Sequence, residues 1–478
     1  MERNVPQQPH RHRDAKQRHD DRDERDDLRQ ATRVRAHRAD LRDLRLVVWI
    51  GRKQQRLRCR QRHAEPIFAL KRRYVVRVAV IGSGVAGLGA AYVLAKAHDV
   101  ELFEQDARPG GHANTVTYDG LTLDTGFLVH NLRNYPLLTR LFTELGVETQ
   151  EAEMSFSVVC DSCGLEYSGR RPFAQRRNLV RPAHYKLLWE IGRWLRTAGR
   201  TLEEADWESQ SLGEYLDAHG YSSAFRNHFL IPLTSALWST APGRALEFPA
   251  AYAIRFYDNH GMLGFGRFAW RTVTGGSKTY VDAVVATLPN GARLNQGVRS
   301  IARSEGGVDV RTPDGLTHRF DRVVIATHAD EALALLEDPS DAERAILGAF
   351  AYTVNETILH TDASLLPRTK AARGSWNYRM GNDGAPTLTY YLNRLQRLES
   401  TRDYCVTLNE EIPEAHVLAR FSYAHPLFTV GTIDAQHALA ALSGERGTFY
   451  AGAHMGNGFH EAGLASGVRA AAALGVEW

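Results

Sequence analysis

The clearest pattern in the chain is an apolar run, a glycine-rich turn and a helical repeat that begin at residue 77, in "RVAVIGSGVAGLGAAYVLAKAHDVELFEQD". Val78, Val80 and Ile81 predict a short strand, and the Ala- and Leu-rich residues after the turn follow the period of a helix. Residues 99–104, "DVELFE", predict a second strand. The order strand, turn, helix, strand indicates an α/β fold.

The glycines in the turn fit the spacing G-x-G-x-x-G. Gly82 allows a tight turn, Gly84 lets the backbone approach a pyrophosphate, and Gly87 lets the helix pack on the strand. Phosphates would then lie at the positive end of the helix. An acid about twenty residues on, at the end of the second strand, can accept hydrogen bonds from a ribose diol. The cofactor-binding residues predicted here are Gly82, Ser83, Gly84, Ala86, Gly87 and Glu104, with a simple packing turn as the alternative.

Charge is distributed unevenly along the 478 residues. The formal net charge is +4, but residues 1–75 hold 22 Lys and Arg against 11 Asp and Glu, which leaves 37 against 44 in the rest. The part with a globular pattern is therefore net acidic. Residues 1–74 intersperse acids with bases and lack regular apolar spacing, so we expect a disordered extension or a translation start assigned too far upstream. A nucleic-acid-binding arm is the less favoured interpretation.

No stretch approaches the roughly twenty apolar residues of a membrane span, and no signal-peptide pattern is present. The expected location is cytoplasmic, with peripheral membrane contact as an alternative. The four cysteines are too few for a disulfide scaffold. Cys160 and Cys163 have the C-x-x-C spacing of a redox pair or half a zinc site, but they lie between two strand-like runs. The turn of a β-hairpin is the favoured interpretation, and no metal site is predicted.

The residues after Glu104 contain a second motif, and this motif resembles that of a known superfamily. Arg108, Gly110, Gly111 and Thr115 form R-x-G-G-x-x-x-T, which resembles the superfamily of flavin amine oxidases, protoporphyrinogen oxidases and phytoene desaturases. Its members often have an arginine after the glycine pair, where this chain has His112. The resemblance is greatest to bacterial FAD-binding proteins whose genes often neighbour cyclopropane fatty acid synthases, and this suggests a lipid substrate.

Further segments match the same superfamily. The turn after "LTLD", the strand ending in "VVIAT" and the closing "YAGAHMGNGFHEAG" resemble its other flavin-contacting segments. The resemblance implies non-covalent FAD bound in a Rossmann-type, glutathione-reductase-like domain, with an interleaved α+β substrate domain. It also implies that the N-terminus of the last helix faces the flavin. The further cofactor-binding residues that it implies are Arg108, Gly110, Gly111, His112, Asp124, Gly126, Phe127, Val298, Ala326, Thr327, Gly452, Phe459, His460 and Glu461.

The expected domain organisation alternates between cofactor and substrate segments. The FAD-binding segments are residues 75–130, 266–330 and 441–478, and the substrate-domain segments are the mostly helical 131–265 and the sheet-forming 331–440. Residues 181–200 predict an amphipathic helix, which packs its apolar stripe on the core or lies on a membrane. The strands "SWNYRM" and "PTLTYY" offer Trp376 and Tyr391 as side chains that face the flavin.

These features predict an FAD-dependent oxidoreductase of the oxidase or desaturase type. No nucleophile triad, metal-ligand set or second dinucleotide fingerprint is apparent, so electrons from the substrate would pass to oxygen, a quinone or another carrier. The favoured substrate is apolar, with a fatty acyl chain as one candidate. Amine oxidation comes second, because residues 328–350 lack the lysine of superfamily amine oxidases. His460, for proton handling, and Tyr391 are the catalytic candidates, and the alternative for His460 is that it only anchors its loop. A non-catalytic FAD-binding or nucleic-acid-binding module is the alternative of another class.

Overall fold

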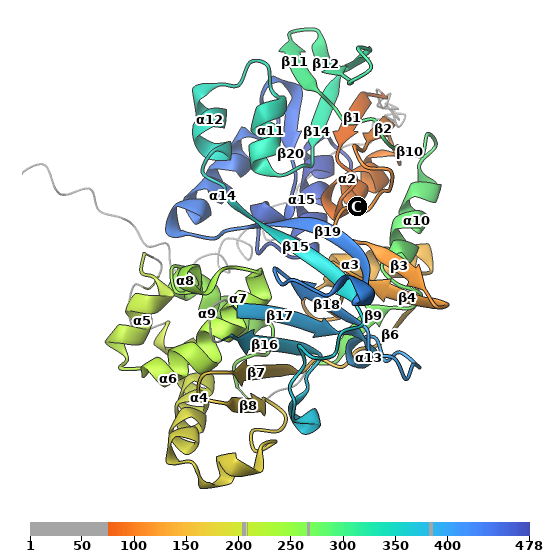
Figure 1. The fold of residues 1–478 in the computed structure, drawn as a ribbon. Helices are drawn as coiled ribbons and strands as arrows, with labels where there is room; N and C mark the ends of the chain where they lie inside the picture. Colours follow the sequence, from red (N-terminus) through yellow and green to blue (C-terminus); the bar gives the residue numbers. More distant parts are fainter. Residues whose placement is uncertain (1–74, 203–206, 208, 265–267, 382–385) are drawn as a thin grey trace, which may run out of the picture. The chain divides into compact units, whose positions relative to one another are not determined.

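The computed structural model describes residues 75–202, 207, 209–264, 268–381 and 386–478. Expectations for the N-terminal extension therefore lie outside the described residues. The described chain contains a five-stranded parallel sheet in the order β10-β2-β1-β14-β20. Its strands are β1 (Arg77–Ile81), β2 (Asp99–Phe103), β10 (Ala292–Arg293), β14 (Arg322–Ile325) and β20 (Thr448–Tyr450). Three distant segments of the chain thus form one sheet (Figure 1).

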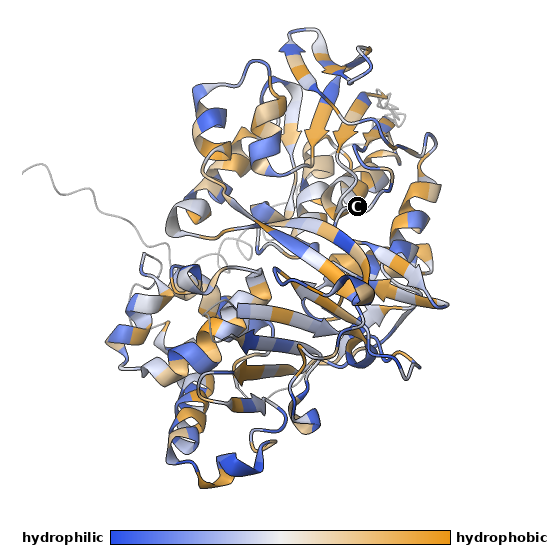
Figure 2. Cartoon of the chain, viewed as in Figure 1, coloured by the Kyte–Doolittle hydropathy of each residue, from blue (hydrophilic) through white to orange (hydrophobic). Residues whose placement is uncertain are grey.

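The central strands are apolar because both faces of this sheet are covered. In Figure 2 they are mostly orange, and the apolar residues of β1 and β14 are at most 3% exposed. One face packs on four helices, and the other packs on three helices and the antiparallel sheet β11-β12-β13. The first group is α2 (Val85–Leu94), α3 (Pro136–Leu145), α10 (Lys278–Thr287) and α15 (His460–Ala473). The second is α11 (Ala329–Leu335), α12 (Asp341–Leu347) and α14 (Val430–Leu442), with β11 (Ser300–Ser304), β12 (Gly307–Arg311) and β13 (Thr317–Phe320).

A mixed seven-stranded sheet has the order β19-β15-β18-β17-β16-β7-β8. Its strands are β7 (Phe156–Cys160), β8 (Leu165–Ser168), β15 (Tyr352–His360), β16 (Trp376–Met380), β17 (Pro386–Tyr391), β18 (Cys405–Leu408) and β19 (Val417–Pro426). The antiparallel pair β7–β8 confirms the hairpin predicted around the C-x-x-C turn. Strands β16 and β17 confirm the two strands predicted from "SWNYRM" and "PTLTYY", and the short helix α13 (Leu392–Leu395) follows them.

Small sheets link these two parts. They are β3-β4, formed by Thr115–Tyr118 and Leu121–Asp124, and β5-β9-β6, formed by His130–Asn131, Trp270–Val273 and Thr149–Glu151. The helical elements between β8 and β9 are η1 (Arg176–Val180), α4 (Pro182–Thr201), α5 (Leu212–Ala218), α6 (Ser223–Phe225), η2 (Arg226–Leu230), α7 (Ile231–Trp238), α8 (Pro242–Ala245) and α9 (Ala250–Asn259). Their core is largely aromatic.

Helix α4 confirms the amphipathic helix predicted at 181–200. Leu187 and Trp194 are buried in the aromatic core, and Ile191 and Leu195 pack against it. The apolar stripe thus packs on protein, as the first of the two interpretations expected. Across the described part of the chain, no helix is both long enough and apolar enough to cross a membrane.

Candidate active site

A cavity of about 770 Å³ lies where the parallel sheet meets the seven-stranded sheet and the helices. Its wall includes residues 81–86, 103–106, 108, 110–112, 297–298, 326–328, 452–454 and 458–460, which belong to the three segments that form the parallel sheet. Carboxyl ends of parallel strands are where α/β proteins bind ligands. The cavity therefore occupies the position of a cofactor site.

Glu104 anchors one end of the cavity. It follows β2 directly, and its carboxylate accepts hydrogen bonds from the Ser83 backbone N–H at 2.9 Å and the Ser83 hydroxyl at 2.5 Å. Its other oxygen accepts from the Asp106 backbone N–H at 2.9 Å. The side chain is therefore fixed in the wall, and an oxygen of a carboxylate has lone pairs for more than one donor. A ribose diol fits this acceptor.

The N-terminus of α2 faces the same space. Its N-cap residue is Gly84, no side chain caps the helix, and no acid lies in its first turn. A Cβ built on Gly84 would meet no atom within 4 Å, whereas one on Gly87 would lie 1.9 Å from the Gly82 carbonyl oxygen. Gly87 is thus required by packing, and Gly84 leaves room for a ligand. Free N–H groups at a helix N-terminus beside open space suit a pyrophosphate.

The glycine pair after β2 completes this end. The Gly110 backbone N–H donates to the Ser83 carbonyl at 3.0 Å, and Arg108 donates to the Gly111 carbonyl at 2.9 Å. Arg108 therefore braces the loop while its side chain lines the cavity. The sequence-predicted cofactor residues that line the cavity are Gly82, Ser83, Gly84, Ala86, Glu104, Arg108, Gly110, Gly111, His112, Gly126, Phe127, Val298, Ala326, Thr327, Gly452, Phe459 and His460.

Asp124 and Glu461 are not among the lining residues, and both have structural partners instead. Asp124 is buried and accepts hydrogen bonds from Thr115 and Ser277, while burial raises its pKa to about 6. Glu461 accepts the backbone N–H groups of Leu137 and Leu138 and so caps α3. Both side chains thus bind protein groups, and the cofactor contact predicted for the two turns that hold them stays a prediction.

Tyr391 is also absent from the cavity wall, although the sequence favoured it as a catalytic residue. Its hydroxyl donates to Asp403 at 2.6 Å. Successive side chains of a strand point to opposite faces, and Tyr390 is the one that lines the cavity, together with Trp376 from β16. Because side chains alternate along β17, Tyr390 and not Tyr391 is the residue of this pair that can contact a ligand in the cavity.

His460 begins α15 and lines the cavity. Its ring stacks on Phe127 with the ring centroids 3.8 Å apart, and its Nε2 forms a hydrogen bond of 2.9 Å with the Tyr280 hydroxyl. Burial, with a smaller contribution from His130, lowers the pKa of His460 to about 3. The imidazole is thus neutral at pH 7 and held in one orientation, so its proton exchange would pass through Tyr280.

The sequence did not identify a cluster of histidines in the wall. His328, His425 and His454 join His112 there, with the His112 and His425 rings 5.2 Å apart and the His112 and His328 rings 6.4 Å apart. Burial is the main cause that lowers the pKa of His425 to about 4 and that of His454 to about 3. His328 directly follows the predicted Ala326 and Thr327, so its position at a strand end was a usable signal. His425 lies on β19, and no local motif indicates it.

The other end of the cavity is mainly apolar and aromatic. Its lining residues from the helices and small sheets are Met154, Leu237, Ser239, Phe256, His260, Met262 and Trp270, and the seven-stranded sheet adds Trp376, Tyr390 and residues 422–426. The acids in the described wall, Glu104, Asp106 and Glu331, come instead from the segments around the parallel sheet. The cavity therefore joins a polar, glycine-lined end to an end without carboxylates.

This arrangement is that of an α/β protein with a dinucleotide-type site whose cavity continues into an aromatic end, and comparisons with known proteins identify the family. Residues 85–475 match the family described as flavin containing amine oxidoreductase. The chain belongs to that family. A Mycobacterium tuberculosis protein named as a flavin-containing monoamine oxidase is 28% identical over 281 residues, which are 56% of this chain and 60% of that relative. The match thus spans less than two thirds of the relative's length.

Solved structures share the fold. A fatty acid isomerase from P. acnes that produces CLA superposes with a TM-score of 0.62 at 18% identity, and it covers 84% of this chain and 98% of its own. A putrescine oxidase bound to putrescine has the same TM-score at 15% identity, with 84% and 98% of the two chains covered. Identities this low establish the likeness of the fold alone.

Proposed function

We propose that this protein is an FAD-dependent oxidoreductase of the oxidase or desaturase type, acting on an apolar substrate. The observation that carries the proposal is the single cavity that joins the glycine-lined end to the aromatic end. FAD, when bound, takes up a hydride from a substrate C–H bond. Oxygen, a quinone or another carrier would then remove the two electrons.

The chain's own residues supply distinct parts of a non-covalent FAD site. Glu104 accepts from the ribose, and the N-terminus of α2 binds the pyrophosphate. The N-terminus of α15, whose N-cap residue Phe459 makes no side-chain cap bond, stabilises negative charge on the flavin. In the described part of the chain no cysteine lines the cavity, which agrees with non-covalent binding.

The aromatic end of the cavity favours an apolar substrate over an amine. A protonated amine that leaves water needs a carboxylate or equivalent partner. The described wall beyond the nucleotide end offers none, and burial lowers the pKa of its His260. An alkyl chain, in contrast, gains about 0.8 kcal/mol for each CH₂ that it buries. We therefore rank a fatty-acyl substrate first and an amine second.

Trp376 gives the aromatic end a hydrogen-bond donor without a partner among the described residues. This donor, the indole Nε1, is buried, although the side chain lines the cavity. An unsatisfied buried donor costs about 1–3 kcal/mol, and a ligand acceptor would remove that cost. A carbonyl or carboxylate on an otherwise apolar chain matches this donor.

Anaerobic reduction of the bound flavin tests the proposal. The purified protein is expected to absorb in the blue and to be bleached by fatty acids or acyl esters, but not by monoamines or polyamines. Trp376→Phe should raise the substrate concentration needed for half-maximal bleaching about tenfold or more, while Trp189→Phe, at an exposed tryptophan, should not. Bleaching by amines alone would support amine oxidation instead, and a protein that binds no FAD would refute both.

An exposed patch supports contact with a membrane surface, from which an apolar substrate could be taken. Leu179 and Val180 at the end of η1, and Tyr185 and Trp189 on α4, are 52%, 81%, 49% and 62% exposed. The outward-facing cations beside them are Arg176, Arg177 and Lys186. Apolar and aromatic side chains among cations are typical of helices that bind anionic bilayers.

Sedimentation with vesicles tests this contact. The protein should pellet with vesicles that contain phosphatidylglycerol and stay in solution with purely zwitterionic ones. The double variant Val180→Asp/Trp189→Ala should lose most of the binding. Leu316→Ala, which removes an exposed leucine from the β12–β13 connection, should bind as the wild type does. Equal binding by all variants would contradict the assignment of the patch.

A further inference from the structure

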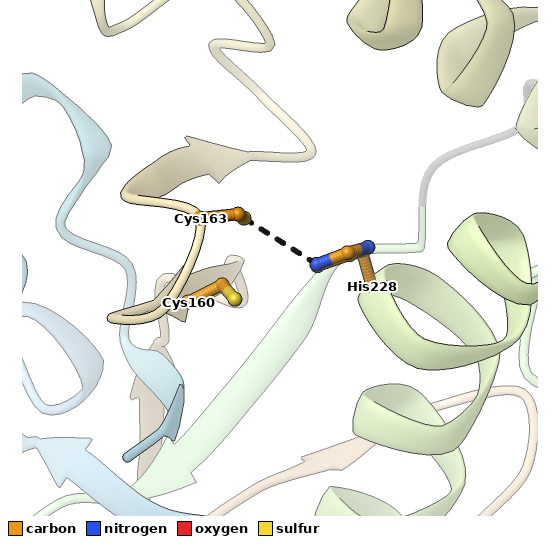
Figure 3. Close-up of side chains that lie close together, drawn as sticks. All are labelled: Cys160, Cys163 and His228. Atoms are coloured by element: carbon orange, nitrogen blue, oxygen red, sulfur yellow. Dashed lines mark hydrogen bonds between the residues drawn. The ribbon is translucent and has the colours of Figure 1, made fainter. Parts of the chain in front are cut away.

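Two cysteines and one histidine meet outside the cavity. Cys160 ends β7 and Cys163 lies in the hairpin turn, whereas His228 lies in η2, 65 residues further on. The two Sγ atoms and one imidazole nitrogen lie within 4.8 Å of one another. Figure 3 shows the cysteine side chains and the imidazole directed toward one another from the hairpin and the helix.

The distances suit a tetrahedral metal ion. The Cys163 Sγ lies 3.6 Å from the His228 Nε2. Zinc bonds of about 2.3 Å to sulfur and about 2.0–2.1 Å to nitrogen, at a tetrahedral angle, put these two atoms about 3.5–3.6 Å apart. The two ligand atoms thus already have the spacing that a shared zinc ion requires.

The imidazole is held in the form that a metal needs. Its Nδ1 lies 3.1 Å from the Ala224 carbonyl oxygen, which can only accept a hydrogen bond. Nδ1 therefore carries the proton, and the lone pair of Nε2 points at the cysteines. A carbonyl that fixes the second nitrogen in this way is the usual outer partner of a metal-binding histidine. The η2 segment is also a π-helical turn, a deviation found frequently at functional sites.

The groups around Cys160 and Cys163 favour their thiolate forms and zinc as the bound metal. Cys160 is buried and its Sγ lies 3.2 Å from the Ser162 hydroxyl, which can donate to a thiolate. The Arg177 guanidinium lies against Gly164, the next residue after Cys163. Two thiolates neutralise a divalent ion, and their softness together with imidazole selects zinc among the abundant divalent metals. Cys163 is exposed, so the ion has a path from solvent.

We propose that Cys160, Cys163 and His228 form a zinc site whose fourth ligand is a water molecule. Binding releases the two thiol protons to solvent and leaves the oxidation state of every atom unchanged. The ion would tie the β7–β8 hairpin to the segment that leads into α7. Because Leu237 and Ser239, at and after the end of α7, line the cavity, the site would stabilise one wall of the substrate end without taking part in the reaction.

Zinc content and coordination test the proposal on the reduced, full-length flavoprotein. Every variant carries Cys59→Ser, because Cys59 lies outside the described residues. We expect about one zinc per chain, with X-ray absorption showing two sulfur atoms at about 2.3 Å. Cys163→Ser and His228→Gln should each weaken zinc binding at least tenfold, since even outer partners contribute 10- to 100-fold. Cys405→Ser and His416→Gln, which remove the same residue types elsewhere, should bind zinc as their parent does.

Cysteine alkylation and flavin absorbance distinguish a variant that has lost only the zinc site from one that no longer folds. Zinc should protect Cys160 and Cys163 from iodoacetamide, and the ligand variants should keep the flavin absorbance of their parent. A reduced protein without stoichiometric zinc would overturn the proposal. Coordination by nitrogen and oxygen alone, or unchanged affinity in both ligand variants, would do so as well. A Cys160–Cys163 disulfide that persists in the protein isolated under reducing conditions would replace the zinc site with a redox pair.

Discussion

The replacement Glu104→Gln isolates the charge that we assign to ribose recognition. The side chain keeps its shape, but one oxygen becomes an NH₂ group that cannot accept a hydrogen bond. In the wild type both oxygens accept from protein donors, Ser83 on one side and the Asp106 backbone on the other. The amide therefore loses an acceptor toward the loop or toward the ribose, whichever way it is oriented.

The expected magnitude follows from the strength of hydrogen bonds to charged groups. Each contributes about 1.5–3 kcal/mol, so FAD affinity should fall about ten- to 150-fold. FMN has no adenosine ribose, so its weaker binding should change far less. Quenching of flavin fluorescence on titration into the apoprotein measures both affinities.

An acid on β2, the strand that Glu104 follows, provides the control for this prediction. Glu101 pairs with Arg77 and Arg293 and does not line the cavity. Glu101→Gln should leave FAD affinity within about twofold, because Glu101, Arg77 and Arg293 all lie outside the cavity wall. If Glu104→Gln binds FAD as tightly as the wild type, or loses FMN and FAD affinity equally, the assignment of Glu104 to the ribose is wrong.

Three further predictions concern packing, a buried ion pair and pH. Gly87→Ala should lower the melting temperature measured by calorimetry, because the added Cβ has no room. Gly84→Ala should leave the apoprotein stable, because the Cβ meets no atom, but it should weaken FAD binding measured by titration. Glu343→Gln should cost about 1.5–3 kcal/mol in urea unfolding, since the Arg303 guanidinium loses its charged bidentate partner and keeps Asp338. The pKa of His454 in the folded protein is about 3. Acidification from pH 7 to pH 5 therefore protonates this histidine in the unfolded chain but not in the folded one. The apoprotein should lose about 2 kcal/mol through this group, and His454→Gln should show a correspondingly smaller loss.

The nucleotide end of the site could be predicted because its information is local. Gly82, Gly84 and Glu104 lie within one strand–turn–helix–strand unit, and spacing along the chain fixes their positions in space. Tyr391 illustrates the opposite case. Both faces of β17 are buried, so the sequence does not alternate between apolar and polar residues and does not show which side chains face the cavity. The prediction therefore chose Tyr391, whereas the adjacent Tyr390 lines the cavity.

Residues that meet only through the tertiary fold could not be predicted. His112, His328, His425 and His454 come from four separate segments, and no spacing rule brings them together. The same holds for the cysteine turn. Its hairpin was predictable from the flanking strands, but the third ligand, His228, is supplied by a helix whose packing against β7 and β8 no local pattern reveals.

The order of strands in the parallel sheet constrains how the chain is synthesised and folds. Central strand β1 lies between β2, which soon follows it, and β14, more than 240 residues later; β14 in turn pairs with β20 near residue 450. Closing such long loops is slow. During translation the first βαβ unit must therefore wait, with both edges unpaired, until β10 and β14, about two thirds of the way along the chain, have left the ribosome. Flavin uptake should consequently be a late, post-translational event, and chaperones that shield open sheet edges should raise the yield of active protein.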